Sequence, residues 1–168
     1  MSLEENKRVA LRFIEEMVAG RRENVEQMLT DDAVMFYWGD FWFSGRLSAD
    51  EYFARMSAAS KDAFAAGPSP SGTPYLEIHI GEVTAEDDRV CVEGEDWIPL
   101  PDGTMLNPQF HLLFQMRDGK VAVFKDYVDS HHLHLGLTGA RSRDPGRVRE
   151  SNVFEVKHVI TGRGQASG

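Results

Sequence analysis

The chain has 168 residues, which is enough for one compact domain with a core of its own. Its composition, 42% hydrophobic and 27% charged, is that of an ordinary globular protein. The formal net charge is −9, but it is uneven: residues 140–168 carry +3 and residues 1–139 carry −12. Because residues 1–139 are this acidic, they offer no cationic surface for phosphates, and we expect no nucleic acid partner.

Hydropathy and cysteine content predict an intracellular protein. No apolar run approaches the roughly 20 residues that span a bilayer. The charged residues at positions 4, 5, 7 and 8 argue against a signal peptide. Cys91 is the single cysteine, which excludes an intramolecular disulfide. We therefore expect a cytoplasmic protein with no membrane partner.

Two helices are marked by capping boxes. Ser2 and Glu5 form an S-x-x-E box before apolar residues at helical spacing, in a helix that should end at Gly20. Ser48 and Glu51 form a second box, before a longer helix. The other expected elements are, in chain order, a short helix over 23–29, a strand over 33–38, an aromatic-rich turn over 39–45, a loop over 68–74, and strands over 75–85 and 89–100.

A hairpin is predicted at Asp118-Gly119, two residues that stand between alternating apolar runs. Counting outward from this turn places His111 opposite Asp126, with Gln109 and Phe124 on the same face of the sheet. An imidazole beside a carboxylate among apolar neighbours is a candidate reaction centre. The alternative is an exposed polar pair on a solvated face of the sheet.

A second turn at Asp102-Gly103 would extend this site. Counting outward from it places Gln109 opposite Asp96 and His111 opposite Gly94, so Asp96 joins the imidazole and carboxylate on the buried side. Desolvation would raise the pKa of such a carboxyl, which then can act as an acid or base near neutral pH. A slip by one residue would move each of these side chains to the other face.

Other motifs indicate no metal and no cofactor. The histidines at 131, 132 and 134 lack the HExxH spacing, so we predict a solvated tail rather than a metal site. His79 stands in a strand and is predicted to be a structural histidine. The chain has no G-x-S-x-G, no P-loop and no dinucleotide G-x-G-x-x-G.

The order of elements predicts an α+β architecture, in which a helical layer packs on a strongly bent, mostly antiparallel sheet. The short connections at 86–88 and 101–103 favour an antiparallel meander. Residues 141–147 show no periodicity and are predicted to form a mobile linker. Residues 153–160 could form a late strand that pairs with a partner subunit.

The block D-G-K-V-A-V-F-K-D-Y-V-D over 118–129, together with D-D-A-V over 31–34, resembles the SnoaL-like and ketosteroid isomerase-like families of the NTF2-like superfamily. The resemblance covers about residues 3–135. It implies a cone, in which a curved sheet wraps around three N-terminal helices and encloses a pocket. The domain would then span 1–139, with a C-terminal extension over 140–168, and the protein would be a homodimer.

The resemblance also implies roles for residues. In the polyketide cyclases an Asp on the last strand, here Asp126, is the acid/base for an aldol ring closure, and His111 and Gln109 match a nearby His and Gln. In limonene-epoxide hydrolase relatives two Asp act with an Arg; Asp96 and Asp126 resemble the pair, but Gly94 stands where an Arg would be needed. Ketosteroid isomerases use a Tyr–Asp oxyanion hole, for which Tyr37 and Asp96 are candidates.

We therefore predict a cofactor-independent acid/base enzyme that isomerises or cyclises a hydrophobic, carbonyl-bearing small molecule. The alternatives are water chemistry of the epoxide hydrolase or dehydratase type, or a non-catalytic ligand-binding or dimerisation module. The predicted catalytic residues are Asp126, His111 and Asp96, and the predicted substrate-binding residues are Gln109, Tyr37, Trp38, Phe124 and Asn107.

Overall fold

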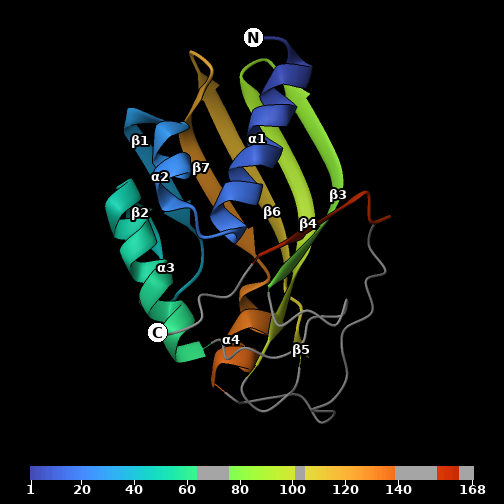
Figure 1. Cartoon of the computed structure of the whole chain (residues 1–168). Coiled ribbons are helices and arrows are strands. Elements are labelled where there is room, and N and C mark those ends of the chain that lie inside the picture. The colour runs from blue at the N-terminus through green and yellow to red at the C-terminus, as the bar shows by residue number, and fades with distance from the viewer. Residues whose placement is uncertain (64–75, 101–104, 139–154, 163–168) are drawn as a thin grey trace.

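The computed structural model describes residues 1–63, 76–100, 105–138 and 155–162 (Figure 1). The elements within them are α1 (Leu3–Val18), α2 (Arg22–Gln27), β1 (Leu29–Tyr37), β2 (Gly45–Leu47), α3 (Ala49–Ala63), β3 (Glu77–Glu86), β4 (Arg89–Pro99), β5 (Met105–Leu106), β6 (Gln109–Arg117), β7 (Lys120–Val128), α4 (Ser130–Thr138) and β8 (His158–Thr161). The predicted loop over 68–74, the Asp102-Gly103 turn and the linker over 141–147 lie outside the described residues.

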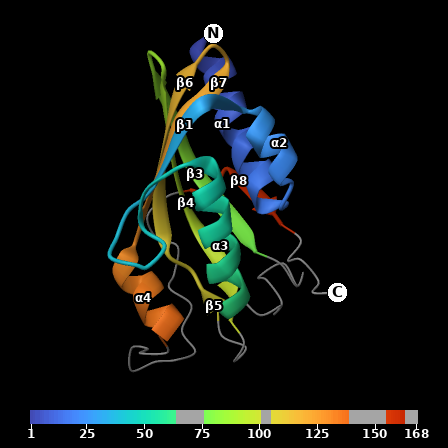
Figure 2. The same ribbon diagram turned by 90° about the vertical axis from the view of Figure 1, so that its left-hand side faces the viewer.

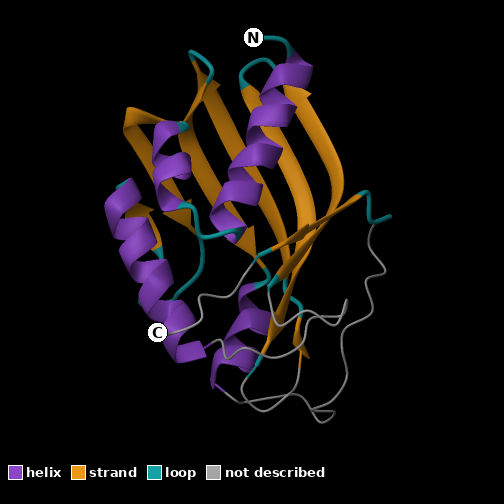
Figure 3. Cartoon of the chain, in the orientation of Figure 1, coloured by secondary structure: helices purple, strands orange, loops and turns teal. Residues whose placement is uncertain are grey.

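One curved sheet carries the described strands, in the order β2-β1-β7-β6-β4-β3-β8, and β5 pairs with β4 (Figure 3). β1 and β7 are parallel, while the other described pairs are antiparallel. Irregularities in register interrupt β1–β7, β3–β4 and β6–β7. Such bulges increase the local bend and twist of a sheet, which suits a sheet that curves around helices.

Helices α1, α2 and α3 lie on one side of the sheet, as the side view shows (Figure 2). We call the face toward these helices the inner face and the opposite one the outer face. Phe13 of α1 packs on Phe114 and Phe124 at ring-centroid distances of 5.6 and 5.5 Å, and Tyr52 of α3 lies 5.8 Å from Phe124. The main core therefore lies between the helices and the inner face.

Both predicted capping boxes are confirmed. The backbone N–H of Ser2 donates to Glu5 Oε2 at 2.7 Å and the Ser2 hydroxyl accepts from the Glu5 N–H at 3.3 Å. The same reciprocal bonds join Ser48 and Glu51 at 2.9 and 3.2 Å. Each box satisfies N–H groups that have no partner inside the helix, which fixes where α1 and α3 begin.

Three local predictions are corrected. β1 begins at Leu29 rather than at residue 33, and it pairs in parallel with β7. The histidines at 131–134 lie in a helix, α4, rather than in a tail. The late strand β8 begins at His158 rather than at residue 153, and it pairs with β3 of the same chain, through Ile160 opposite Ile78.

Among the described residues, none of the helices is both long enough and apolar enough to cross a bilayer.

Candidate active site

The Asp118-Gly119 turn forms where the sequence places it, with φ of +52° and +80° at its two residues. The flanking pairs are also as predicted up to Met116 opposite Val121. A β-bulge follows, because Gln115 pairs with Val123 and Ala122 is left as an extra residue. Every pair beyond the bulge is therefore shifted by one residue.

This shift corrects the predicted His111–Asp126 pair. Asp126 stands opposite Leu112, which is buried, and His111 stands opposite Tyr127. Because side chains alternate between the two faces of a strand, a shift by one residue separates His111 and Asp126 onto opposite faces. Asp126 lies on the inner face and His111 on the outer face, where it is exposed.

The second predicted register is also off by one. Glu95, not Asp96, stands opposite Gln109, and Glu93, not Gly94, stands opposite His111. Gln109 and His111 are therefore both on the outer face and cannot reach the two aspartates. The backbone N–H of Asp96 instead donates to the carbonyl of Pro108 at 3.0 Å.

Asp96 does share the inner face with Asp126. On β4 it alternates with outer-face neighbours, and its partner on β3 is Ile78, a buried inner-face residue. Both aspartates are only partly buried as whole residues. The Oδ1 atom of Asp126, however, is fully buried, and it has no hydrogen-bond partner in the part of the chain that the structure describes.

Two tyrosines complete this inner-face cluster. Tyr37 of β1 pairs with Asp126 of β7 in the parallel register, so the two residues are direct neighbours. Tyr52 comes from α3, and both tyrosine side chains belong to the buried core. Tyr52 was not among the residues predicted for the site. The signal that could have marked it is its hydroxyl, because a buried tyrosine usually needs a polar partner.

Burial gives the two carboxyl groups unusual protonation properties. Burial raises the pKa of Asp126 to about 7. The pKa of Asp96 is raised well above its ordinary range, first by burial and then by the negative charges of Asp126 and Glu95. Burial and the two neighbouring charges therefore favour the protonated form of Asp96, while Asp126 can exchange its proton near neutral pH.

The tyrosines remain neutral donors at the same pH. Burial is the largest cause of the raised pKa of Tyr37 and of Tyr52, and the charges of Asp126 and Asp96 raise both further. These electrostatic couplings join the four groups into one cluster, which we call the inner-face site: Tyr37, Tyr52, Asp96 and Asp126.

Three further residues predicted for the site, Phe124, Trp38 and Asn107, are not members of the inner-face site. Phe124 is fully buried against Phe13, Tyr52 and Phe114, so it is a core residue beside the inner-face site. Trp38 is 46% exposed and stacks on the outer-face residue Tyr127 at 5.3 Å. Asn107 is buried in the connection between β5 and β6.

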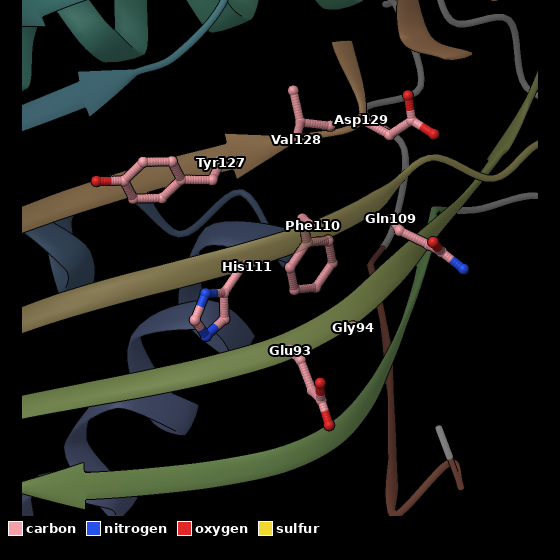
Figure 4. Close-up of a pocket in the computed structure, with 8 residues that line it drawn as sticks. All are labelled: Glu93, Gly94, Gln109, Phe110, His111, Tyr127, Val128 and Asp129. Atoms are coloured by element: carbon pink, nitrogen blue, oxygen red, sulfur yellow. The ribbon is translucent and has the colours of Figure 1, made fainter. Parts of the chain in front are cut away.

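The outer face carries a shallow groove of about 380 Å³ (Figure 4). Glu93, His111 and Tyr127 form a row across β4, β6 and β7, with α1 behind the strands. The full lining consists of Glu93, Gly94, Gln109, Phe110, His111, Tyr127, Val128 and Asp129. The predicted His111 and Gln109 thus line a groove, but the sheet separates it from Asp96 and Asp126.

The described residues contain no group of three or more His, Cys, Asp or Glu side chains placed to hold a metal ion. In α4, His132 and His134 are two residues apart, a spacing that does not bring side chains together on one helix face.

No protein-family model matches the chain, and no curated protein does. Solved structures do match. An NTF2-like protein from Burkholderia xenovorans LB400 is 19% identical, with a TM-score of 0.62 over 82% of this chain and 98% of that one. A protein assigned as a SnoaL-like polyketide cyclase, from Jannaschia sp. CCS1, is 18% identical, with a TM-score of 0.60 over 80% and 92%. An LEH-like epoxide hydrolase from M. tuberculosis is 18% identical, with a TM-score of 0.57 over 82% and 92%.

These likenesses confirm the predicted fold. The chain has the NTF2-like fold, an α+β cone in which a mostly antiparallel curved sheet wraps around helices. At such identities the likeness concerns the fold, and fold alone does not determine the reaction.

Proposed function

We propose that the protein is a cofactor-independent acid/base enzyme that moves a proton on the carbon next to the carbonyl group of a hydrophobic small molecule. The observation that carries this proposal is the raised pKa and the burial of the Asp126 carboxyl group. Its pKa of about 7, and its buried Oδ1 that has no hydrogen-bond partner among the described residues, describe a carboxylate that can take a proton and return it at neutral pH.

Each member of the inner-face site has a role in the proposed reaction. Asp126 takes a proton from the α-carbon, and the electron pair of the broken C–H bond moves onto the carbonyl oxygen to give an enolate. Asp96, held neutral, donates a hydrogen bond to that oxygen. The phenol of Tyr37, directly beside Asp126, supplies a second donor. Tyr52 supplies a third from α3.

The fate of the enolate distinguishes two outcomes. Return of the proton from Asp126 to a different carbon isomerises the substrate. Attack of the enolate carbon on a second carbonyl of the same molecule forms a ring, and the resulting alkoxide takes up the proton from Asp126. Both outcomes leave the enzyme in its starting state and need no cofactor.

The surroundings favour an apolar, uncharged substrate. Tyr37 packs edge-on against Phe41 and Phe43, at centroid distances of 6.4 and 5.0 Å. An anionic substrate would meet the charge of Asp126 in a desolvated setting, which is costly without a cationic partner. The aromatic wall instead suits flat, hydrophobic molecules.

Water chemistry is the second candidate, because an LEH-like epoxide hydrolase is among the similar structures and two aspartates share the inner face. Gly94 weighs against it. A Cβ atom at Gly94 would lie 2.5 Å from Phe110 Cζ and from the His79 carbonyl oxygen. The position therefore has no room for the long cationic side chain that the hydrolase pattern requires, so proton transfer is the better supported reaction.

We also propose that the chain forms a homodimer through its outer face. Trp38 and Tyr127 are exposed and stack at 5.3 Å, and Phe36 stacks on Trp38 at 6.2 Å. Clustered exposed aromatic side chains are typical of the centre of a protein interface. A dimer of this kind would leave the inner-face site of each subunit free, because that site faces the helices.

The proposed reaction is tested with 2-tetralone, a bicyclic aromatic ketone, in D₂O. Wild-type protein should accelerate the exchange of the α-protons of 2-tetralone for deuterium, which proton NMR measures. Asp126→Asn should abolish this acceleration. Asp118→Asn, at the exposed hairpin turn, is the matched control. Equal acceleration by wild type and Asp126→Asn would remove Asp126 from its proposed role. Styrene oxide in ¹⁸O-labelled water tests the alternative, which requires labelled diol.

A further inference from the structure

A second cluster of ionisable residues lies on the outer face, where β3 and β4 pair. Glu77 stands opposite Trp97, and His79 stands opposite Glu95. One ring nitrogen of His79, Nε2, lies 3.2 Å from Glu77 Oε2, and the other, Nδ1, lies 3.7 Å from Glu95 Oε1. The imidazole thus stands between two carboxyl groups. We call Glu77, His79, Glu95 and Trp97 the outer cluster.

Glu95 is buried although it lies on the outer face of the sheet. It is 0% exposed, and its neighbour in the outer cluster, Glu77, is 1% exposed. The indole N–H of Trp97 donates to Glu95 Oε1 at 2.8 Å, whereas Glu95 Oε2 is buried with no hydrogen-bond partner in the described part of the chain. The indole N–H at 2.8 Å and the imidazole at 3.7 Å are thus the polar neighbours of this buried carboxyl group.

Glu95 is also the residue directly before Asp96. The two side chains project to opposite faces of β4, since successive residues of a strand alternate. Their Cα atoms are joined by one peptide unit, and Glu95 is fully buried while Asp96 is partly buried. A charge on Glu95 therefore acts on Asp96 through a medium that screens it weakly.

We propose that the outer cluster holds a buried negative charge directly behind Asp96 and thereby keeps Asp96 protonated as a hydrogen-bond donor in the inner-face site. Glu95 is then a positioning residue, because it acts through Asp96 and does not touch the substrate. The inference rests on the proposed function only for the role of Asp96 as a hydrogen-bond donor to the enolate oxygen. The raised pKa of Asp96, to which the charge of Glu95 contributes, agrees with it.

Other groups also face these two carboxyls. Asp126 acts on Asp96 from β7 with the same sign as Glu95, so each must be removed separately. On the outer side, Glu95 faces His79 of β3 and the uncharged Gln109 of β6. On β8, the partners of His79 and Glu77 are Val159 and Thr161, which do not titrate. Among the described residues, His79 is the titratable group that lies within ion-pair distance of Glu95, with Nδ1 3.7 Å from Oε1.

The test is a carbon-13 NMR titration of the side-chain carboxyl of Asp96, assigned by its loss in Asp96→Asn. In wild-type protein this carboxyl should remain protonated at pH 7. In Glu95→Gln, whose amide oxygen can still accept from Trp97, the titration midpoint should fall by about one pH unit, the effect of one charge about 10 Å away at an effective dielectric constant of about 20.

Glu93→Gln is the matched control, because Glu93 lies two residues away on the same face of β4 and is less buried than Glu95. It should leave the midpoint unchanged. Trp97→Phe is the second variant: it keeps Glu95 but removes its donor, so it should lower the midpoint by less than Glu95→Gln does. This variant decides the matter if Glu95→Gln does not fold.

An unchanged midpoint in both Glu95→Gln and Trp97→Phe would overturn the inference, as would an ionised Asp96 in wild-type protein at pH 7. The readout needs no substrate, so it separates this inference from the proposed reaction. If the 2-tetralone test fails while the midpoint still depends on Glu95, the outer cluster keeps its role and the reaction is the part that is wrong.

Discussion

Tyr37 lies directly beside Asp126, because the parallel register of β1 and β7 pairs these two residues. The phenol and the carboxylate therefore reach the inner face from adjacent strands, next to one another. Burial of both keeps the phenol neutral and moves the pKa of the carboxyl to about 7. A proton acceptor and a proton donor thus stand side by side, which is what the formation of an enolate requires.

Replacing Tyr37 with Phe should lower kcat for α-proton exchange by roughly 100-fold, since removal of one donor to a developing oxyanion has an effect of about this size. KM should change little, because the aromatic ring that contacts the substrate is retained. Tyr127→Phe, on the outer face, is the control and should exchange at the wild-type rate. Loss of activity in both variants, or in neither, would contradict the assignment of Tyr37.

The pH profile of kcat/KM should be bell-shaped. Asp126 must be ionised to act as a base, so the rate should rise as the pH passes through about 7. Asp96 must be protonated to act as a donor, so the rate should fall again at a pH well above the ordinary range for a carboxyl. The two limbs belong to the coupled pair. A rate that is flat from pH 5 to pH 9 would exclude this pairing of roles.

Asp126→Asn should be more stable than the wild-type protein above pH 7. The pKa of Asp126 is higher in the folded chain than in the unfolded chain, so folding favours the protonated form, and stability falls as the pH rises from about 4 to about 7. Asn stays neutral and avoids this loss, which amounts to at most about 4 kcal/mol. Urea unfolding at pH 5 and pH 8 measures it; a variant that gains nothing at pH 8 relative to pH 5 would contradict the raised pKa.

Gly94→Ala should destabilise the protein by about 1–3 kcal/mol, the usual effect of an added methyl group in a packed interior. The new Cβ would lie 2.5 Å from both the Phe110 ring and the His79 carbonyl, and the carbonyl belongs to the backbone and cannot move aside cheaply. Glu93→Ala, one residue earlier on the outer face, is the comparison. Thermal unfolding of the two variants should separate them by several degrees, with Gly94→Ala the less stable.

The oligomeric state should depend on the outer face. If Trp38 and Tyr127 lie in a homodimer interface, then Trp38→Glu should dissociate the dimer, because a buried charge without a partner is costly. Sedimentation velocity measures this directly. Trp42→Glu is a suitable control, since Trp42 is also exposed but belongs to the turn before β2. A monomeric wild-type protein would refute the proposed dimer.

Local signals in the sequence predicted local structure well. The capping boxes at Ser2 and Ser48 and the Asp118-Gly119 turn each act within a few residues, so a single sequence suffices to read them. The fold followed from the order of the elements and from the resemblance of the block over 118–129. These predictions agree with the structure because they do not depend on long-range register.

Which side chains face one another in the site depends on the register of the strands, and the register predicted from the sequence was wrong by one residue. The bulge at Ala122 adds one residue to β7, and nothing in the run Val121-Ala122-Val123 distinguishes a bulge from a regular strand. One extra residue moved His111 to the outer face and brought Leu112 opposite Asp126. Tyr52 was missed for a different reason, because its electrostatic interaction with the aspartates arises from the packing of α3 on the sheet.

The central claim is that burial on the inner face gives Asp126 a proton that it can exchange at neutral pH. It is tested most directly by a carbon-13 NMR titration of the Asp126 side-chain carboxyl in wild-type protein, assigned with Asp126→Asn. We predict a midpoint of about 7. A midpoint near 4, the value of a solvated aspartate, would contradict the account.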